Sequence, residues 1–304
     1  MASPTGTSDA PFGRALTAMV TPFTSDGAVD YEGVQRIAAY LVDDQRNDGL
    51  IVSGTTGESP TTSDEEKDRI LRAVVEAVGD RATIVAGAGT NDTRHSVELA
   101  RAAERAGAHG LLVVTPYYSR PPQEGLVRHF TAVADATGLP VMLYDIPGRA
   151  ATPITTESLF RLAEHPRITA VKDAKGDLFA GSQVMAGTDL VFYSGDDLLN
   201  LPWLSVGAVG YVSVVGHVVG PDLVAMCDMY RTGDVAGALE THRRLLPVVS
   251  AIMTRTQGAI MVKAALTLLG QDGGHVRPPL VDATREQIAA LREDLITGGL
   301  KLVD

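Results

Sequence analysis

Short apolar, β-rich runs alternate with helical patterns through the first 215 residues of this 304-residue chain. There are eight such runs, over residues 15–23, 49–54, 82–89, 110–117, 140–146, 168–174, 190–195 and 210–215. Helix signals lie between them, such as a capping box at Ser63 and Glu66 before residues 64–78 and Gly107 after residues 93–106. Strand–helix alternation implies parallel pairing, and eight units predict an α/β fold, a (β/α)8 TIM barrel. A doubly wound open sheet is the alternative, because both folds bury their strands on two faces.

The strand signal disappears after residue 220, and four helical patterns separated by Gly or Pro follow. They predict a C-terminal helical extension over residues 231–304, which follows a barrel over residues 12–230 that carries the active site. Residues 1–11 have neither the basic region nor the apolar run of a signal peptide. We expect them to form a short disordered tail.

Charge and cysteine content exclude several functions. The formal net charge is −11 and no Lys/Arg cluster exceeds an Arg pair, which argues against a nucleic-acid partner. The single cysteine, Cys227, excludes an internal disulfide, fits a cytoplasmic location and is expected to pack in a helix. No Cys/His spacing predicts a structural zinc. Residues 198–221 are uncharged but contain Pro202 and four glycines, which favours a buried strand over a membrane span.

In a (β/α)8 barrel, active-site groups lie at the C-terminal ends of the strands. Four segments meet this condition: "GTTGES" at 54–59, "TPYYSRP" at 115–121, "YDIPGR" at 144–149 and the strand that carries Lys172. The first lacks the Lys-Ser/Thr of a nucleotide-binding loop. It is interpreted as a nest of backbone N–H groups and two hydroxyls for a carboxylate, with a plain turn as the alternative. His217, which follows the eighth run without partners, is interpreted as structural.

The stretch "ITAVKDAKG" at 168–176 places one of only five lysines in an apolar strand. Period two puts Ile168, Ala170 and Lys172 on one face. Lysine is almost never fully buried unless it is paired or functional. A neutral amine attacks a ketone to form a Schiff base, which then acts as an electron sink. Tyr144 ends the neighbouring strand and can move the protons that imine formation requires, so Lys172 is predicted to form an imine.

The segments "GTTGES", "VTPYYSRPPQEG", "LYDIPGR" and "AVKDAKG", in this order and at these spacings, resemble the dihydrodipicolinate synthase (4-hydroxy-tetrahydrodipicolinate synthase) family. This family belongs to the pyruvate-dependent class I aldolases typified by N-acetylneuraminate lyase. The resemblance runs from about Phe12 through the eighth strand. It implies a lyase that condenses pyruvate with L-aspartate 4-semialdehyde, the first committed step of diaminopimelate and lysine biosynthesis. It implies no metal and no cofactor beyond the covalent imine.

The resemblance also implies roles for individual residues. The implied catalytic residues are Lys172, Tyr144, Thr55 and Tyr118, and the implied substrate-binding residues are Gly54, Thr56, Arg149 and Val212. Lys172 would form the Schiff base, and Tyr144 would donate and accept the proton. Tyr118 would reach into the site of a neighbouring subunit, within a homotetramer built as a dimer of dimers.

Thr55 and Thr56 would bind the pyruvate carboxylate and link Tyr144 to Tyr118 in a proton relay. The main-chain carbonyl of Val212 would face pyruvate, and Arg149 would hold the carboxylate of the second substrate. Arginine at this place suits a substrate with its own carboxylate. An aldolase acting on a sugar acid is the alternative, and a catalytically silent barrel that only binds ligands is a remote one.

Feedback-sensitive members of the family bind free L-lysine at a dimer interface. The matching positions here are Ser59, Lys67, Asn91, His95 and Tyr117. Sensitive members tend to carry histidine at the position of Lys67 and glutamate at that of His95. A histidine supplies no negative charge for an ammonium group, so L-lysine is expected to inhibit weakly or not at all.

Overall fold

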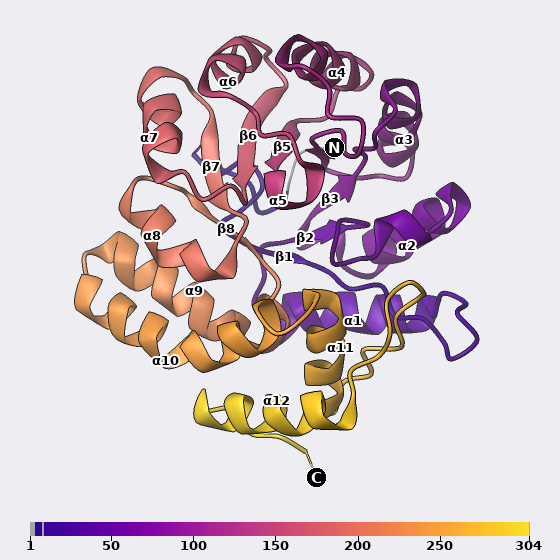
Figure 1. Cartoon of the computed structure of the whole chain (residues 1–304), viewed down its shortest axis with the longest axis vertical. Helices are drawn as coiled ribbons and strands as arrows, with labels where there is room; N and C mark the ends of the chain where they lie inside the picture. Colours follow the sequence, from indigo (N-terminus) through magenta and orange to yellow (C-terminus); the bar gives the residue numbers. More distant parts are fainter. Residues whose placement is uncertain (1–3, 8, 304) are drawn as a thin grey trace.

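The computed structural model describes residues 4–7 and 9–303. Eight parallel strands pair in chain order and close into a barrel, with the first strand bonded to the eighth (Figure 1). The strands are β1 (Ala15–Ala18), β2 (Gly49–Val52), β3 (Thr83–Gly87), β4 (Gly110–Val114), β5 (Val141–Asp145), β6 (Ile168–Asp173), β7 (Val191–Ser194) and β8 (Gly210–Ser213). The predicted (β/α)8 barrel is confirmed, and the open sheet is wrong.

Helices surround the barrel between successive strands (Figure 1). They are α1 (Tyr31–Asp43), α2 (Asp64–Val78), α3 (Thr93–Arg105), α4 (Gln123–Asp135), α5 (Pro147–Ala150), α6 (Thr156–Ala163), α7 (Leu178–Gly187) and α8 (Asn200–Ser205), with short 3₁₀ turns η1 (Ser59–Thr61) and η2 (Asp197–Leu199). The predicted capping box is present, because Glu66 N donates to Ser63 Oγ and Ser63 N donates to the Glu66 carboxylate. The chain leaves α3 through Gly107 at φ 91, where glycine is favoured.

Apolar side chains form two layers, one inside the barrel and one between the strands and the helices. The interior layer contains Phe12, Leu16, Ala18, Ile51, Val85, Leu112, Met142, Tyr144, Ala170, Tyr193 and Val212. Tyr193 helps to close the bottom, because its hydroxyl donates to Gly13 O at 2.9 Å. The barrel is thus a packed core, and chemistry has to occur at its upper rim.

The prediction that Ile168 shares a face of its strand with Ala170 and Lys172 is wrong. Val141 pairs with Ile168 and Met142 pairs with Ala170, so one extra residue of β6 interrupts the register. Ile168 therefore packs in the outer layer, whereas Ala170 points into the barrel. The bulge reverses the alternation at this point only, and Lys172 remains in register with Tyr144.

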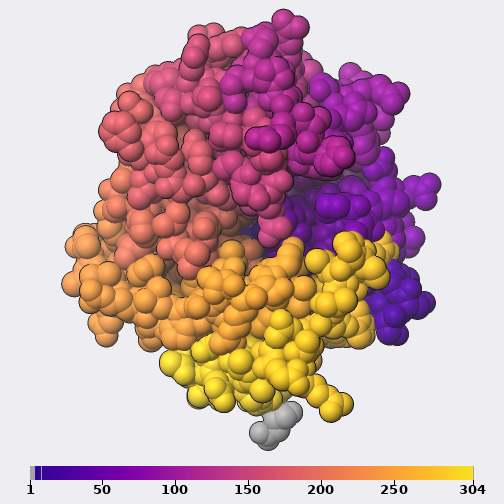
Figure 2. All heavy atoms as spheres, in the orientation of Figure 1, coloured from indigo at the N-terminus to yellow at the C-terminus, as the bar shows by residue number. Residues whose placement is uncertain are grey.

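The C-terminal helices are α9 (Gly216–Thr232), α10 (Val235–Met253), α11 (Gly258–Leu268) and α12 (Arg285–Thr297). They lie along one side of the barrel (Figure 1), and their atoms abut the N-terminal part of the chain in the space-filling view (Figure 2). The predicted boundary after residue 230 falls inside α9, which continues to Thr232 and ends at Gly233 with φ 93. Cys227 is buried in α9, as predicted.

The N-terminal segment differs from the expected disordered tail where the structure describes it, while residues 1–3 and 8 lie outside the described residues. Thr5 Oγ1 donates to Asp48 O at 2.7 Å, and Ala10 is buried. Asp9 forms an ion pair with Arg14 at 2.5 Å. Disorder is therefore wrong for residues 4–7 and 9–11, because these contacts fasten them to the base of the barrel.

Residues 198–221 form the end of η2, α8, the buried strand β8 and the start of α9, so the predicted strand is confirmed. Within the described part of the chain, no single helix is long and apolar enough to cross a membrane. The pair α10 and α11 meets the length and composition test together, with a bend of 116° between the two helices.

Candidate active site

A cavity of about 410 Å³ opens at the C-terminal ends of the strands. Its lining comes from three of the four predicted segments and includes Gly54, Thr55, Ser59, Tyr117, Tyr118, Tyr144, Ile146 and Arg149. The wall is mostly apolar, with a few convergent hydroxyl groups and one cation, which is typical of a small-molecule site. Barrel closure thus assembles residues that lie up to about a hundred positions apart in the sequence.

Lys172 lies directly behind this wall. Its side chain is 4% exposed, and its Nζ is 4.1 Å from the centroid of the Tyr144 ring, which lines the cavity. Lys172 has no ion-pair partner among the described residues. Parallel pairing of β5 with β6 places the two residues opposite each other. An amine beside an aromatic face, without a neighbouring carboxylate to fix its charge, is suited to nucleophilic attack.

Gly195, just after β7, is a site-shaping residue that the sequence analysis missed. A Cβ at this position would lie 2.8 Å from Lys172 Cγ and 2.9 Å from Asp173 O. Only glycine leaves room for the stem of Lys172. The glycine at the end of the run at 190–195 was the available signal, but a glycine there is equally typical of any strand end.

The Gly54–Ser59 loop is a tight turn with strained ends. Ser53 and Glu58 have φ values of 56 and 55, which non-glycine residues rarely adopt. Glu58 N donates to Thr55 O at 3.1 Å, and Ser59 N donates to Gly54 O at 3.2 Å. Gly54 and Thr55 line the cavity, whereas Thr56 is 6% exposed and does not.

The tyrosine pair at 117 and 118 splits between the cavity and solvent. Tyr118 lines the cavity mouth, yet it is 90% exposed and has φ 72. Tyr117 is half-buried, and burial raises the pKa of its phenol. A strained backbone conformation and a solvent-exposed aromatic ring are both unfavourable. Their combination at Tyr118 suggests that the ring contacts a partner outside this chain.

Arg149 lies on the short helix α5 at the cavity edge, where its backbone N donates to Ile146 O at 3.0 Å. Its side chain is exposed, and its guanidinium has no hydrogen bond or ion pair among the described residues. Buried Asp145 supports this segment, because its Oδ1 accepts from Ile154 N at 3.2 Å and its Oδ2 lies 3.4 Å from Lys175 Nζ. Burial raises the pKa of Asp145 to about 6. Val212 lies in the barrel interior and does not line this cavity.

The five candidate effector residues do not share one cavity. Ser59 and Tyr117 line the active-site cavity, whereas Lys67 lines a small neighbouring cavity of about 30 Å³. Lys67 Nζ donates to Thr62 O, and burial lowers the pKa of this lysine. His95 Nε2 is 2.9 Å from Asp64 Oδ2, and Asn91 is exposed.

Metal-ligating clusters are lacking in the part of the chain that the structure describes, where no three His, Cys, Asp or Glu side chains converge. His217 is structural, as predicted. Its Nε2 accepts from Val20 N at 3.1 Å, and its Nδ1 donates to Val214 O at 2.7 Å, so the buried ring is neutral with its proton on Nδ1. Burial lowers the pKa of His217 to about 4.

Comparison with known proteins agrees with this geometry. The model of the dihydrodipicolinate synthetase family matches residues 11–297. The chain belongs to this family. Its curated relatives include the 4-hydroxy-tetrahydrodipicolinate synthase of Acidothermus cellulolyticus, which is 67% identical over 290 residues and covers 95% of this chain and 94% of the relative. The family assignment from the four motifs is therefore confirmed.

Two solved structures of the dihydrodipicolinate synthetase family are informative. The enzyme of Cyanidioschyzon merolae, with lysine bound, superposes with a TM-score of 0.92 at 40% identity and covers 95% of this chain and 99% of its own. A structure described as the first monomeric dihydrodipicolinate synthase variant has a TM-score of 0.90 at 35% identity and covers 95% and 97%. The family thus includes a lysine-binding member and a monomeric variant.

Proposed function

We propose that this protein is a 4-hydroxy-tetrahydrodipicolinate synthase, which condenses pyruvate with L-aspartate 4-semialdehyde in the pathway to diaminopimelate and lysine. Membership of the dihydrodipicolinate synthetase family supports the reaction. The observation that carries the chemistry is Lys172, a buried amine without a carboxylate partner among the described residues, next to Tyr144 at a cavity of about 410 Å³.

The reaction begins when the Lys172 amine attacks the ketone carbon of pyruvate. Loss of water gives the imine, with Tyr144 supplying and removing the proton. The imine draws electrons from the methyl carbon, which loses a proton to form an enamine. The enamine carbon then attacks the aldehyde of the second substrate and forms the new carbon–carbon bond. These steps need no metal or separate cofactor.

Substrate orientation is assigned to the rim. Backbone and hydroxyl groups of Gly54, Thr55 and Thr56 hold the pyruvate carboxylate, and the Val212 carbonyl faces the keto acid. Arg149 binds the carboxylate of the semialdehyde, and its exposed, unpaired guanidinium supports this role. Tyr118 completes the proton relay in the site of a neighbouring subunit, within a tetramer of paired dimers. Its 90% exposure and positive φ support this assignment.

Reduction with borohydride in the presence of pyruvate tests the proposal. One three-carbon adduct per chain, mapped to Lys172, is the expected result. Turnover of aspartate semialdehyde should then exceed turnover of N-acetylmannosamine or glyceraldehyde. An adduct on another lysine, or preference for a sugar aldehyde, would contradict the proposal.

Regulation by L-lysine is proposed to be weak. His95 brings no negative charge and already contacts Asp64, while Lys67 adds a cation near the same carboxylate. Loss of one charge-assisted contact lowers affinity by about 10- to 150-fold. Titration with L-lysine at saturating pyruvate measures this effect. Half-inhibition below ~0.1 mM, a binding free energy of about −5.5 kcal/mol, would contradict the expectation.

A further inference from the structure

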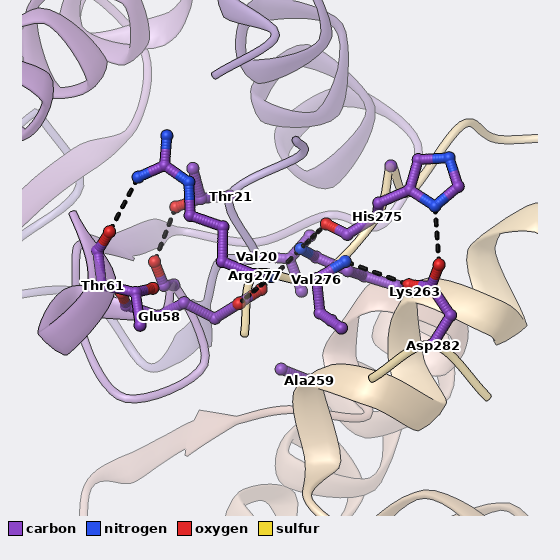
Figure 3. Close-up of polar contacts among 12 residues, drawn as sticks. Val20, Thr21, Glu58, Thr61, Ala259, Lys263, His275, Val276, Arg277 and Asp282 are labelled. Carbon is purple, nitrogen blue, oxygen red and sulfur yellow. Dashed lines mark hydrogen bonds and ion pairs between the residues drawn. The ribbon is translucent and has the colours of Figure 1, made fainter. Parts of the chain in front are cut away.

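A buried ion pair joins the Gly54–Ser59 loop to the C-terminal helices. Glu58 Oε1 accepts from Lys263 Nζ, on α11, at 2.6 Å (Figure 3). The two side chains are 2% and 3% exposed. Neither residue has a role in the proposed chemistry, and the two lie 205 positions apart in the sequence. Two buried charges at this distance need further hydrogen bonds to be tolerated.

Those bonds come from the segment between α11 and α12. Lys263 Nζ also donates to His275 O at 2.6 Å, and Glu58 Oε2 accepts from Arg277 N at 2.9 Å. The Lys263 amine also lies 4.7 Å from the centroid of the Phe23 ring. Burial lowers the pKa of Lys263, and the Glu58 carboxylate opposes that change. The pair is thus enclosed and hydrogen-bonded at both ends.

The Arg277 side chain fastens the segment that follows the Gly54–Ser59 loop. Its guanidinium donates to Thr61 O at 2.7 Å and to both carboxylate oxygens of Glu66 at 2.8 and 2.6 Å. Its Nε donates to Gly27 O at 2.7 Å. These contacts tie the region from η1 to the start of α2 to the C-terminal segment, and Figure 3 shows the contact with Thr61. They attach the chain that directly follows the loop to the same C-terminal segment as the Glu58 carboxylate.

The ion pair is connected to the rest of the Gly54–Ser59 loop through the backbone of Glu58. Glu58 N donates to Thr55 O, and Glu58 itself has the strained φ of 55. On the preceding residue of the loop, Gly57 O accepts from Thr21 Oγ1 at 2.8 Å. A strained residue keeps its conformation only when its surroundings fix it. Here the fixing contacts include those of the Glu58 side chain with Lys263 and Arg277.

We infer that Glu58 and Lys263 are positioning residues, which hold Gly54 and Thr55 in the geometry that binds the pyruvate carboxylate. This inference rests on the proposed function. Removal of Lys263 alone leaves a buried carboxylate without its counter-charge, and the loop has to move to hydrate it. Removal of both charges leaves a neutral side chain that can stay in place and accept from Arg277 N.

Three variants test the inference: Lys263→Met, Glu58→Gln and the double variant. Pyruvate KM and the rate of borohydride trapping are measured well below each midpoint of thermal unfolding. We expect Lys263→Met to raise the pyruvate KM and slow trapping by about 10-fold or more, since small displacements of positioning groups have effects of this size. The double variant should recover most of this loss, as strongly coupled neighbours do.

Arg255→Met is the matched control, because it breaks the ion pair between Arg255 and Asp294 within the C-terminal region without touching the loop. It should lower the unfolding midpoint and leave both kinetic readouts unchanged. Kinetic constants of folded Lys263→Met within about 2-fold of wild type, or a double variant no better than the single one, would overturn the inference.

If Lys263→Met does not fold, Glu58→Gln decides the matter. It is expected to slow trapping by about 10-fold or more, because it weakens the contact that fixes the strained residue, and trapping within about 2-fold of wild type would overturn the inference. If the wild-type protein traps no pyruvate, the proposed function is overturned together with the inference. If the wild type traps pyruvate and the variants trap it at the same rate, only the positioning role is overturned.

Discussion

Among single residues, Lys172 is distinguished by its surroundings. It is buried, it faces the Tyr144 ring, and Gly195 leaves space beside its stem. No carboxylate forms an ion pair with it among the described residues, in contrast to Lys263, which is paired with Glu58. These two buried lysines thus differ in their partners, and the lysine without an ion pair is the proposed nucleophile.

Lys172→Ala should abolish nearly all turnover and pyruvate trapping while the fold survives, because the change removes a buried amine and breaks no ion pair. Circular dichroism and kcat measure the two effects. Lys175→Ala is the matched control, since Lys175 lies just after the strand that carries Lys172, forms an ion pair with Asp145 and should still allow trapping. A folded Lys172→Ala enzyme with more than ~10% of wild-type kcat would contradict the imine assignment.

Arg149→Ala should raise the KM for aspartate semialdehyde by more than ~10-fold, the loss expected for a charge-assisted carboxylate contact, with pyruvate trapping nearly unchanged. Arg128→Ala provides the control, because Arg128 makes only a surface ion pair with Glu124. If the substitution impairs pyruvate trapping as strongly as it raises the KM for aspartate semialdehyde, Arg149 instead supports the structure of the barrel rim.

At the scale of elements, period-two alternation and strand ends are local properties, so the sequence located Lys172, Tyr144 and Arg149 on the rim. Ile168 was misplaced because a bulge depends on the neighbouring strand. The functions of Gly195 and Lys263 were invisible for a related reason. Each depends on a contact across the fold, and a glycine at a strand end or a lysine in an apolar helix is ambiguous by itself.

His217 links two elements and makes stability depend on pH. It joins the residues after β1 to those after β8, and its pKa is lowered to about 4 from 6.5. Between pH 6.5 and 4, His217 is protonated in the unfolded chain but stays neutral in the folded chain. The stability that the neutral ring contributes is therefore complete above pH 6.5 and declines as the pH falls toward 4. His217→Gln should remove this slope, worth at most about 3 kcal/mol over that window.

Denaturant unfolding of wild type and His217→Gln at several pH values between 7 and 4 measures the difference in slope. The variant should also be less stable at pH 7 by about 1–3 kcal/mol, because at least one buried hydrogen bond is impaired. An identical pH dependence in both proteins would show that folding does not shift the pKa of the His217 ring.

For the whole molecule, the role proposed for the exposed Tyr118 in a neighbouring subunit makes activity depend on assembly. Tyr118→Phe should lower kcat by ~10²–10³, the range for one positioned proton-transfer group. Mixing it with Lys172→Ala protein should restore part of the activity, because a mixed dimer places an intact tyrosine beside an intact lysine. Native mass spectrometry verifies subunit exchange. No recovery after verified exchange would contradict a shared site.

The contacts that Lys263 and Arg277 make with the Gly54–Ser59 loop and the segment after it have a consequence for the synthesis of the protein itself. Every residue assigned to the chemistry precedes β8 or lies within it, whereas the groups that fix the Gly54–Ser59 loop are made near the end of translation. A partly synthesised chain therefore carries the proposed nucleophile and proton donor before the residues inferred to position the loop have been made. The inferred positioning role implies that efficient catalysis begins only after the last quarter of the chain has been synthesised.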